Sequence, residues 1–219
     1  LAGIVIAATS ATSQGQGGGA GTGISELPDG SILFRLPDSL ANQQPPWPPS
    51  YMGGAIATGT EYMAIAAPSA AYQDGTDSGV GVVLVYSMTP EEGPELFGVI
   101  HIPYDSGDSF DIDSVSLGIY QDEILVGVSG GDGGDGAVHI YKIDNLDTPF
   151  QSVMGSGFFG GNNNYSKFGA SVAFLPGGPW GNMFLVGAPD AGAGAVVLFG
   201  WEDTNGYYDA WGVIYAPSG

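Results

Sequence analysis

Residues 168–199 read FGASVAFLPGGPWGNMFLVGAPDAGAGAVVLF. This stretch holds three short apolar runs, at 168–174, 184–189 and 194–199, and the residues between them are rich in Gly, Pro, Asn and Asp. Runs of this length, rich in Val and Phe and bounded by turn residues, are typical of β-strands, and no helical period of 3.6 residues links them. The stretch therefore predicts three short strands joined by turns.

The central run recurs four times along the chain. Its equivalent positions are Ile6, Ile65, Val126 and Val186, at intervals of 59, 61 and 60 residues. Such a constant interval indicates a structural repeat. A β-sandwich is the alternative architecture for strands of this kind, but it does not predict a steady interval.

Further strands keep the same phase as the central run, which we term strand B. An A strand precedes it at 52–58, 114–120 and 168–174. A C strand opened by glycine follows at 81–86, 136–141 and 194–199, with a degenerate first copy at 21–27. A D strand ends the unit at 32–34, 99–102, 151–154 and 213–216. Four antiparallel strands in about 60 residues are typical of a propeller blade.

The predicted fold is therefore all-β, a β-propeller-like array of four units in a single domain spanning residues 1–219. The units are expected at about 1–44, 45–104, 105–157 and 158–219. The first unit lacks an A strand, because its B strand begins at the start of the sequence. We expect the B strands of all four units to superpose, each flanked by its own C strand.

The three runs of residues 168–199 resemble the FG-GAP repeat of integrin α-subunit propellers. The residues that carry the resemblance are Phe168 to Ala173, Phe184 to Pro189 and Gly194 to Phe199, and Tyr62 to Tyr86 is a looser match. The resemblance implies an extracellular propeller with a binding or scaffolding role. The family's calcium loop of alternating Asp residues between strands A and B has no counterpart in this sequence.

Charge sets limits on the partners. The chain contains 23 Asp and Glu but only Lys142, Lys167 and Arg35 as cations, for a formal net charge of −20. A polyanion has no surface that neutralises phosphates, so nucleic acid and anionic membranes are excluded as partners. The apolar run Leu1 to Ala8 is too short to span a bilayer and is interpreted as a strand. With no Cys in the chain, the fold depends on packing without disulfides.

Asp residues in Gly-rich loops are candidate ligands for calcium, the one cofactor that the sequence suggests. The clusters are Asp74 and Asp77; Asp105, Asp108, Asp111 and Asp113; and Asp132 and Asp135. The densest cluster predicts a metal site formed by Asp105, Asp108 and Asp111. Solvated turns are the alternative, because Asp-Gly is first of all a turn dipeptide.

Two other features suggest surface chemistry. Asn164-Tyr165-Ser166 is a glycosylation sequon and predicts a glycan on Asn164. Aromatic residues gather late in the chain, at Trp180, Trp201, Tyr207, Tyr208 and Trp211. They suit either packing between blades or stacking on sugars.

No catalytic pattern surrounds the two histidines. His101 and His139 sit inside expected strands with apolar neighbours, and neither has the spacing of a catalytic triad or a metal site. We therefore expect ordinary hydrogen-bonded strand residues and a protein that is not an enzyme.

The missing A strand suggests how the protein works. Without it, the apolar B strand of the first unit exposes an unpaired edge, which invites pairing with another chain. The predicted assembly interface is Leu1, Ile4, Val5 and Ile6. The sequence thus favours an extracellular structural protein that self-assembles, as in a filament. The alternative is an adhesive propeller module that binds carbohydrate or a protein ligand.

Overall fold

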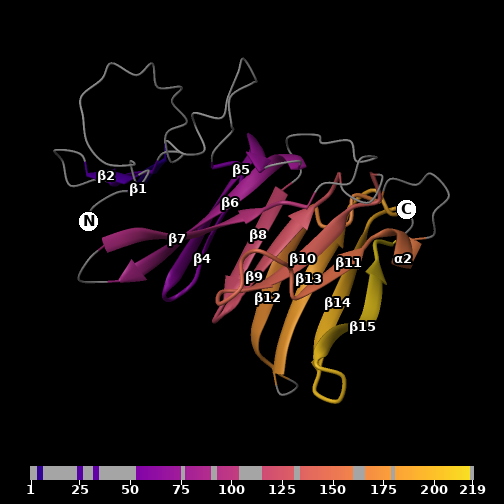
Figure 1. Cartoon of the computed structure of the whole chain (residues 1–219). Helices are drawn as coiled ribbons and strands as arrows, with labels where there is room; N and C mark the ends of the chain where they lie inside the picture. Colours follow the sequence, from indigo (N-terminus) through magenta and orange to yellow (C-terminus); the bar gives the residue numbers. More distant parts are fainter. Residues whose placement is uncertain are drawn as a thin grey trace.

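A computed structural model of the chain has an all-β architecture (Figure 1). It describes residues 4–6, 24–26, 32–34, 53–74, 77–89, 93–103, 115–130, 134–159, 166–178 and 181–217. Within these residues the strands form three four-stranded antiparallel sheets and one three-stranded sheet. The prediction of an all-β protein is confirmed.

Each four-stranded sheet is named here by its first strand. The β4 sheet contains β4 (Ile56–Thr58), β5 (Tyr62–Asp74), β6 (Asp77–Thr89) and β7 (Gly93–His101). The β8 sheet contains β8 (Val115–Tyr120), β9 (Glu123–Val128), β10 (Ala137–Lys142) and β11 (Gln151–Met154). The β12 sheet contains β12 (Ser171–Gly178), β13 (Gly181–Ala188), β14 (Ala195–Glu202) and β15 (Tyr207–Tyr215). In all three sheets the strands pair in chain order.

The strand registers follow the sequence repeat. Ile65 of β5, Val126 of β9 and Val186 of β13 each lie in the second strand of their sheet. The next residue along each of these strands, Ala66, Gly127 or Gly187, pairs with the equivalent position of the C strand. The hairpin of β5 and β6 is longer than the sequence predicts. Its ladder of paired residues resumes after an irregularity between Ala67 and Ala71 and continues to the pair Asp74 and Asp77.

The first unit departs from the expected order. It contains β1 (Ile4–Ile6), β2 (Ile24–Glu26) and β3 (Ile32–Phe34), arranged as β1-β3-β2. The expectation that the first B strand is flanked by its own C strand is wrong, because β1 pairs with β3 and runs parallel to it. A parallel pair needs a long connection, which the segment between Ile6 and Ile32 supplies, whereas β2 and β3 form a local antiparallel pair.

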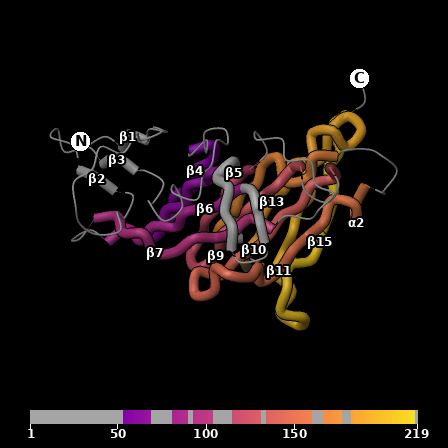
Figure 2. The backbone as a smooth tube through the Cα atoms, turned by 45° about the horizontal axis from the view of Figure 1, so that its top comes forward, coloured from indigo at the N-terminus to yellow at the C-terminus, as the bar shows by residue number. Residues whose placement is uncertain are grey.

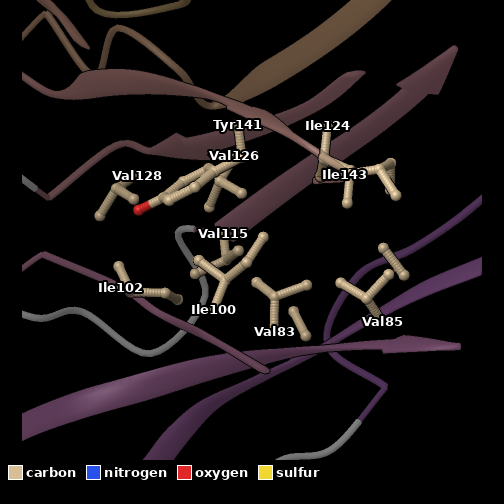
Figure 3. Close-up of a cluster of buried hydrophobic side chains, with 12 residues drawn as sticks. Val83, Val85, Ile100, Ile102, Val115, Ile124, Val126, Val128, Tyr141 and Ile143 are labelled. Carbon is tan, nitrogen blue, oxygen red and sulfur yellow. The ribbon is translucent and has the colours of Figure 1, made fainter. Parts of the chain in front are cut away.

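The β4, β8 and β12 sheets follow one another in chain order (Figures 1 and 2). The middle strands of the β4 and β8 sheets are buried on both faces, whereas those of the β12 sheet alternate between buried and half-buried residues. Between the β4 and β8 sheets, Val83 and Val85 meet Val126 and Tyr141 in one apolar cluster (Figure 3). Val, Ile and Leu on both faces of a strand are typical of a sheet that is covered on both sides.

The next junction uses the equivalent faces. Leu125, Val138 and Ile140 of the β8 sheet pack in one cluster with Val186 and Phe199 of the β12 sheet. The opposite face of the β4 sheet is also buried, with its own cluster of Met63, Ile65, Ala67, Val82, Leu84 and Tyr86. The short helix α2 (Ser156–Phe159) follows β11. Across the described residues, no helix is long and apolar enough to cross a membrane.

Candidate functional site

The β8 and β12 sheets are joined by the turn at Phe168-Gly169. The backbone N–H of Phe168 donates to the Asp135 carbonyl at 3.0 Å, and Phe168 forms an isolated parallel bridge with Gly136. The Ser116 hydroxyl donates to the Gly169 carbonyl at 2.8 Å. The turn that precedes the β12 sheet is therefore hydrogen-bonded to residues of the preceding unit, which contains the β8 sheet.

Glycines permit this close backbone approach. Gly136 has φ +87°, and a Cβ placed on it would clash with the backbone of Phe168. A Cβ on Gly127 would clash with the Gly169 carbonyl, and Gly169 itself has φ +88°. Only glycine adopts such angles at low cost while letting another backbone approach.

The Phe168 side chain anchors the same joint. It is fully buried, stacks on Phe158 of α2 with ring centroids 5.5 Å apart, and contacts Phe199 of β14 edge-on at 6.2 Å. Aromatic pairs of this kind add to the free energy gained from burying the ring. Phe168 thus joins the helix after one sheet to the core of the next.

The groups that receive the turn form what we term the joint socket: Ser116, Gly127, Gly136 and Gly155. Two repeated features show that Ser171, Gly187, Gly194 and Ala216 are the equivalent positions in the β12 sheet. Ser116 pairs with Gly127 as Ser171 pairs with Gly187. The N–H of Gly155 donates to the Gly136 carbonyl at 2.7 Å, and the N–H of Ala216 donates to the Gly194 carbonyl at 2.9 Å.

This second socket, which we term the open socket, receives no turn from the residues that the structure describes. Gly194 has φ +106°, close to that of Gly136, but a Cβ on it would meet nothing nearer than the Pro189 carbonyl at 3.5 Å. A hollow of about 650 Å³ lies there. Its lining includes Ser171, Gly187, Gly194, Val196, Ile214 and Ala216.

The strand beside the open socket is unusually apolar for an exposed edge. Ile214 is 65% exposed and Tyr215 is 61% exposed, and Tyr207, Trp211 and Val213 of the same strand are also exposed. β15 is an edge strand of its sheet, with one charged residue, Asp209, and a register irregularity between Ala210 and Gly212. From Trp211 to Tyr215 it carries no charge and no Pro. An apolar stretch of edge strand without charge or Pro favours association with another chain.

A polar contact links the same two sheets at the opposite end of β9. Glu123 is buried at the start of β9 and accepts a hydrogen bond from the Tyr208 hydroxyl of β15 at 2.5 Å. Lys142 forms an ion pair with the other Glu123 oxygen at 2.6 Å. Burial alone would lower the pKa of Lys142, but the hydrogen bond and charge of Glu123 outweigh it and raise that pKa. Burial, followed by the bond to Glu123, also raises the pKa of Tyr208.

Tyr208→Phe is expected to lower the free energy of unfolding by about 1–3 kcal/mol, because buried Glu123 loses a hydrogen-bond donor. Since the folded-state pKa of Tyr208 is raised, its contribution to stability is complete below its unfolded-state pKa of about 10 and is lost as pH rises through the folded-state value. In urea titrations at a series of pH values above 10, the free energy of unfolding should therefore fall less steeply with pH in the variant than in the unmodified chain. Tyr207→Phe, at an exposed neighbour, is the control and should change stability by less than about 0.5 kcal/mol.

The aromatic residues near the C-terminal end of the sequence differ in their surroundings. Trp201 and Tyr208 contact each other with centroids 5.2 Å apart, and Trp201 also lies 6.0 Å from Phe150 of the preceding unit. Packing between sheets, one of the two interpretations of these residues, therefore holds for Trp201 and Tyr208. Trp201 also lines a hollow of about 280 Å³ with Glu123, Lys142 and Asn182. Trp180 lies outside the described residues.

Many of the residues that the sequence predicts for a functional site lie outside the described residues. These are Asp105, Asp108, Asp111, Asp113 and Asp132, the sequon residue Asn164, and Leu1 of the predicted assembly interface. In the part of the chain that the structure describes, no group of three or more His, Asp or Glu side chains could hold a metal ion. Calcium binding and glycosylation stay predictions.

The remaining predicted residues lie in or next to strands. Ile4, Val5 and Ile6 form β1. Asp74 and Asp77 are cross-strand partners at the end of the hairpin of β5 and β6. Asp135 contributes its carbonyl to the joint with Phe168. His101 ends β7, and His139 of β10 is buried and hydrogen-bonded through Nδ1 to Ser152 at 2.8 Å.

The sockets and the Glu123 contact were not predicted. A signal for the sockets exists, because Ser116 and Ser171 both lie opposite a small B-strand residue. The two serines are not separated by the repeat interval, since the strands β12 and β13 are longer than β8 and β9, at 8 residues each against 6. No sequence signal distinguished Glu123 from the other acidic residues.

No protein-family model matches the chain. No curated protein matches it either.

Proposed function

We propose that this chain is an extracellular structural protein that assembles from copies of itself and catalyses no reaction. In this proposal its units are blades of a propeller-like array related to FG-GAP repeats. The repeated use of equivalent faces between successive sheets supports the array. The FG residues of the last unit, Phe168 and Gly169, lie at a joint between two sheets, which supports a role in blade contacts.

The observation that carries self-assembly is the apolar end of the array. The open socket and Ile214 of β15 are the equivalents of the joint socket and Val153 of β11, and Val153 packs against the apolar cluster between the β8 and β12 sheets. Exposed apolar patches next to a free strand edge mark sites of protein association. At the other end of the chain, Leu1, Ile4, Val5 and Ile6 remain the proposed interface of the first unit.

Deletion of Leu1 to Ala8 is expected to reduce assembly, because it removes an apolar strand whose backbone groups and side chains would pair with another copy. Each backbone hydrogen bond contributes about 0.5–1.5 kcal/mol net, and apolar burial adds about 25 cal/mol per Å². Sedimentation velocity at micromolar concentration measures the change. An intact chain that stays monomeric would contradict the proposed assembly.

A binding module for carbohydrate or a protein ligand is the second candidate. The hollow beside Trp201 favours it, because an aromatic ring with nearby amide and charged groups suits sugar stacking and hydrogen bonding. The same sedimentation experiment separates the two functions. A chain that stays monomeric and is retained on immobilised oligosaccharide or a cell-surface protein extract supports the binding module.

A further inference from the structure

We propose that Lys142 and Asn182 form an isopeptide bond that links the β8 sheet to the β12 sheet, with Glu123 as the group that moves the protons. The bond is an amide between the side-chain nitrogen of Lys142 and the side-chain carbonyl carbon of Asn182. It forms once in each chain, without turnover, so it is compatible with a structural protein that is not an enzyme. It does not depend on self-assembly.

The first step of the argument is the place of Glu123 and Lys142 in the β8 sheet. They are cross-strand partners on β9 and β10, and the pair Leu125 and Ile140 lies two positions further along. Side chains two positions apart on a strand share a face. Leu125 and Ile140 pack in the apolar cluster that the β8 sheet shares with the β12 sheet. Glu123 and Lys142 therefore lie on the face that meets the β12 sheet.

The second step is the place of Asn182 in the β12 sheet. Met183 pairs with Gly200, so the same register places Asn182 opposite Trp201. Trp201 is in turn the cross-strand partner of Tyr208 on β15. Residues opposite each other in an antiparallel pair share a face, so Asn182, Trp201 and Tyr208 lie on one face. Tyr208 is buried in the cluster between the two sheets, which makes this the face toward the β8 sheet.

The third step is the set of contacts that brings the reacting groups together. Glu123, Lys142 and Asn182 line one hollow of about 280 Å³ with Trp201. Lys142 Nζ lies 2.6 Å from Glu123 Oε1 and 6.0 Å from the centroid of the Trp201 ring. The Tyr208 hydroxyl donates to Glu123 Oε2 at 2.5 Å. Burial and Glu123 raise the pKa of Tyr208, and a hydrogen bond from the Asn182 amide to the same hydroxyl offsets part of that rise. Glu123 thus contacts the amine directly and the amide through Tyr208.

The reaction needs an uncharged amine, because only the lone pair of a neutral lysine attacks a carbonyl carbon. Glu123 is 1% exposed, and burial disfavours the charged form of both an acid and an amine. Transfer of one proton along the 2.6 Å hydrogen bond gives a neutral Lys142 beside a neutral Glu123.

The charge around Lys142 sets the pH dependence of the reaction. Although burial would lower the pKa of Lys142, the hydrogen bond and charge of Glu123 raise it. The other titratable groups that face Lys142 are Asp122 at 3.5 Å, Asp144 across the neighbouring hollow, and Tyr208 from the β12 sheet. Because the raised pKa keeps most of Lys142 charged at neutral pH, bond formation should accelerate as the pH rises.

The atoms balance without another reactant. Lys142 transfers one proton to Glu123, and its Nζ lone pair forms a bond to Cγ of Asn182. Glu123 then passes that proton to Nδ2 and accepts a second one from Nζ. The bond between Cγ and Nδ2 breaks with its electron pair on nitrogen, and ammonia leaves. Ammonia takes the second proton from Glu123, so the products are the new amide and one ammonium ion.

Intact mass and tryptic fragments test the bond. After incubation at mildly alkaline pH, the chain should weigh one ammonia less than its sequence. An Asn that cyclises to a succinimide also releases ammonia, so the fragments are compared as well. The basic residues are Arg35, Lys142 and Lys167, and trypsin does not cleave after an acylated lysine. In the linked chain the fragments 36–167 and 168–219 should stay together after denaturation, whereas the unlinked chain gives 36–142, 143–167 and 168–219 separately.

Two matched pairs of variants identify the reacting groups. Lys142→Arg keeps the positive charge and should keep the full mass, while Lys167→Arg, at an exposed lysine, should still lose ammonia. Asn182→Ser should keep the full mass. Asn145→Ser should still lose ammonia, although Asn145 lines the neighbouring hollow with Lys142.

Glu123→Gln should slow the loss of ammonia about a hundredfold or more, because the proton carrier is removed. Circular dichroism shows whether this variant folds; if it does not, Lys142→Arg and Asn182→Ser decide the question. The proposal is overturned if the unmodified chain keeps its full mass at every pH, or if its fragments separate despite the loss of ammonia. It is also overturned if Lys142→Arg still loses ammonia. Loss of water in place of ammonia would mean that Lys142 is bonded to Glu123, and would overturn it too.

Discussion

Gly136→Ala is expected to lower the free energy of unfolding by about 4 kcal/mol. At φ +87° the new side chain is strained, which costs about 1–3 kcal/mol. Its Cβ would also overlap the backbone of Phe168, so the turn must move out of the joint socket. The bridge between Gly136 and Phe168 is lost with that movement. Urea unfolding followed by tryptophan fluorescence measures the loss.

Gly194→Ala is the matched control. Gly194 occupies the equivalent place in the β12 sheet, also at positive φ, but among the described residues nothing lies closer to its Cβ position than the Pro189 carbonyl at 3.5 Å. Only the backbone strain remains, and the expected loss is about 1–2 kcal/mol. Equal losses for the two variants would mean that the seated Phe168-Gly169 turn does not stabilise the chain.

Phe168→Ala should cost about 3–5 kcal/mol, the range for removing a buried phenylalanine and leaving a cavity. The variant loses the stacking on Phe158 and the edge contact with Phe199. Because Phe168 lies between two sheets, we also expect the β12 sheet to exchange its amide hydrogens faster relative to the β4 sheet. Equilibrium unfolding and hydrogen exchange measure the two effects.

Phe97→Ala is the control for size and chemistry. Phe97 is 48% exposed on β7, and its ring contacts only Tyr62 among the described aromatic residues. Its removal should cost less than about 1 kcal/mol. A loss at Phe168 no greater than that at Phe97 would show that the joint does not hold the sheets together.

Much of the fold could be predicted from residues close together in the sequence. The order A, B, C, D within a unit follows from alternating or doubly apolar runs joined by turn residues, and the three complete sheets have that order. The three strands of the first unit lie within the predicted runs, but their pairing was predicted wrongly. A short run such as Ile4 to Ile6 does not specify its partner, and the run Ile32 to Phe34, with which it pairs, is more apolar than the expected partner at 21–27.

The candidate site was less predictable than the fold. Phe168-Gly169 was recognisable as part of a repeat, yet its contact with Asp135 and Gly136 joins residues of two different units. Glu123 is one of 23 acidic residues, and its hydrogen-bond donor Tyr208 lies on a strand far along the chain. Neither contact leaves a periodic pattern that a sequence could reveal.

The sequence by itself determined the all-β fold class and the length of the repeat, because the formation of strands and turns depends on the local pattern of side chains. It also determined where Gly allows tight backbone approach, since positive φ angles are open to few other residues. Only the tertiary structure decided which glycines are covered. Gly136 is under Phe168 while Gly194 is open, although the two positions repeat each other. The reason is that the joint socket is filled by a turn from outside its own sheet, and the residues around each glycine do not specify that distant contact.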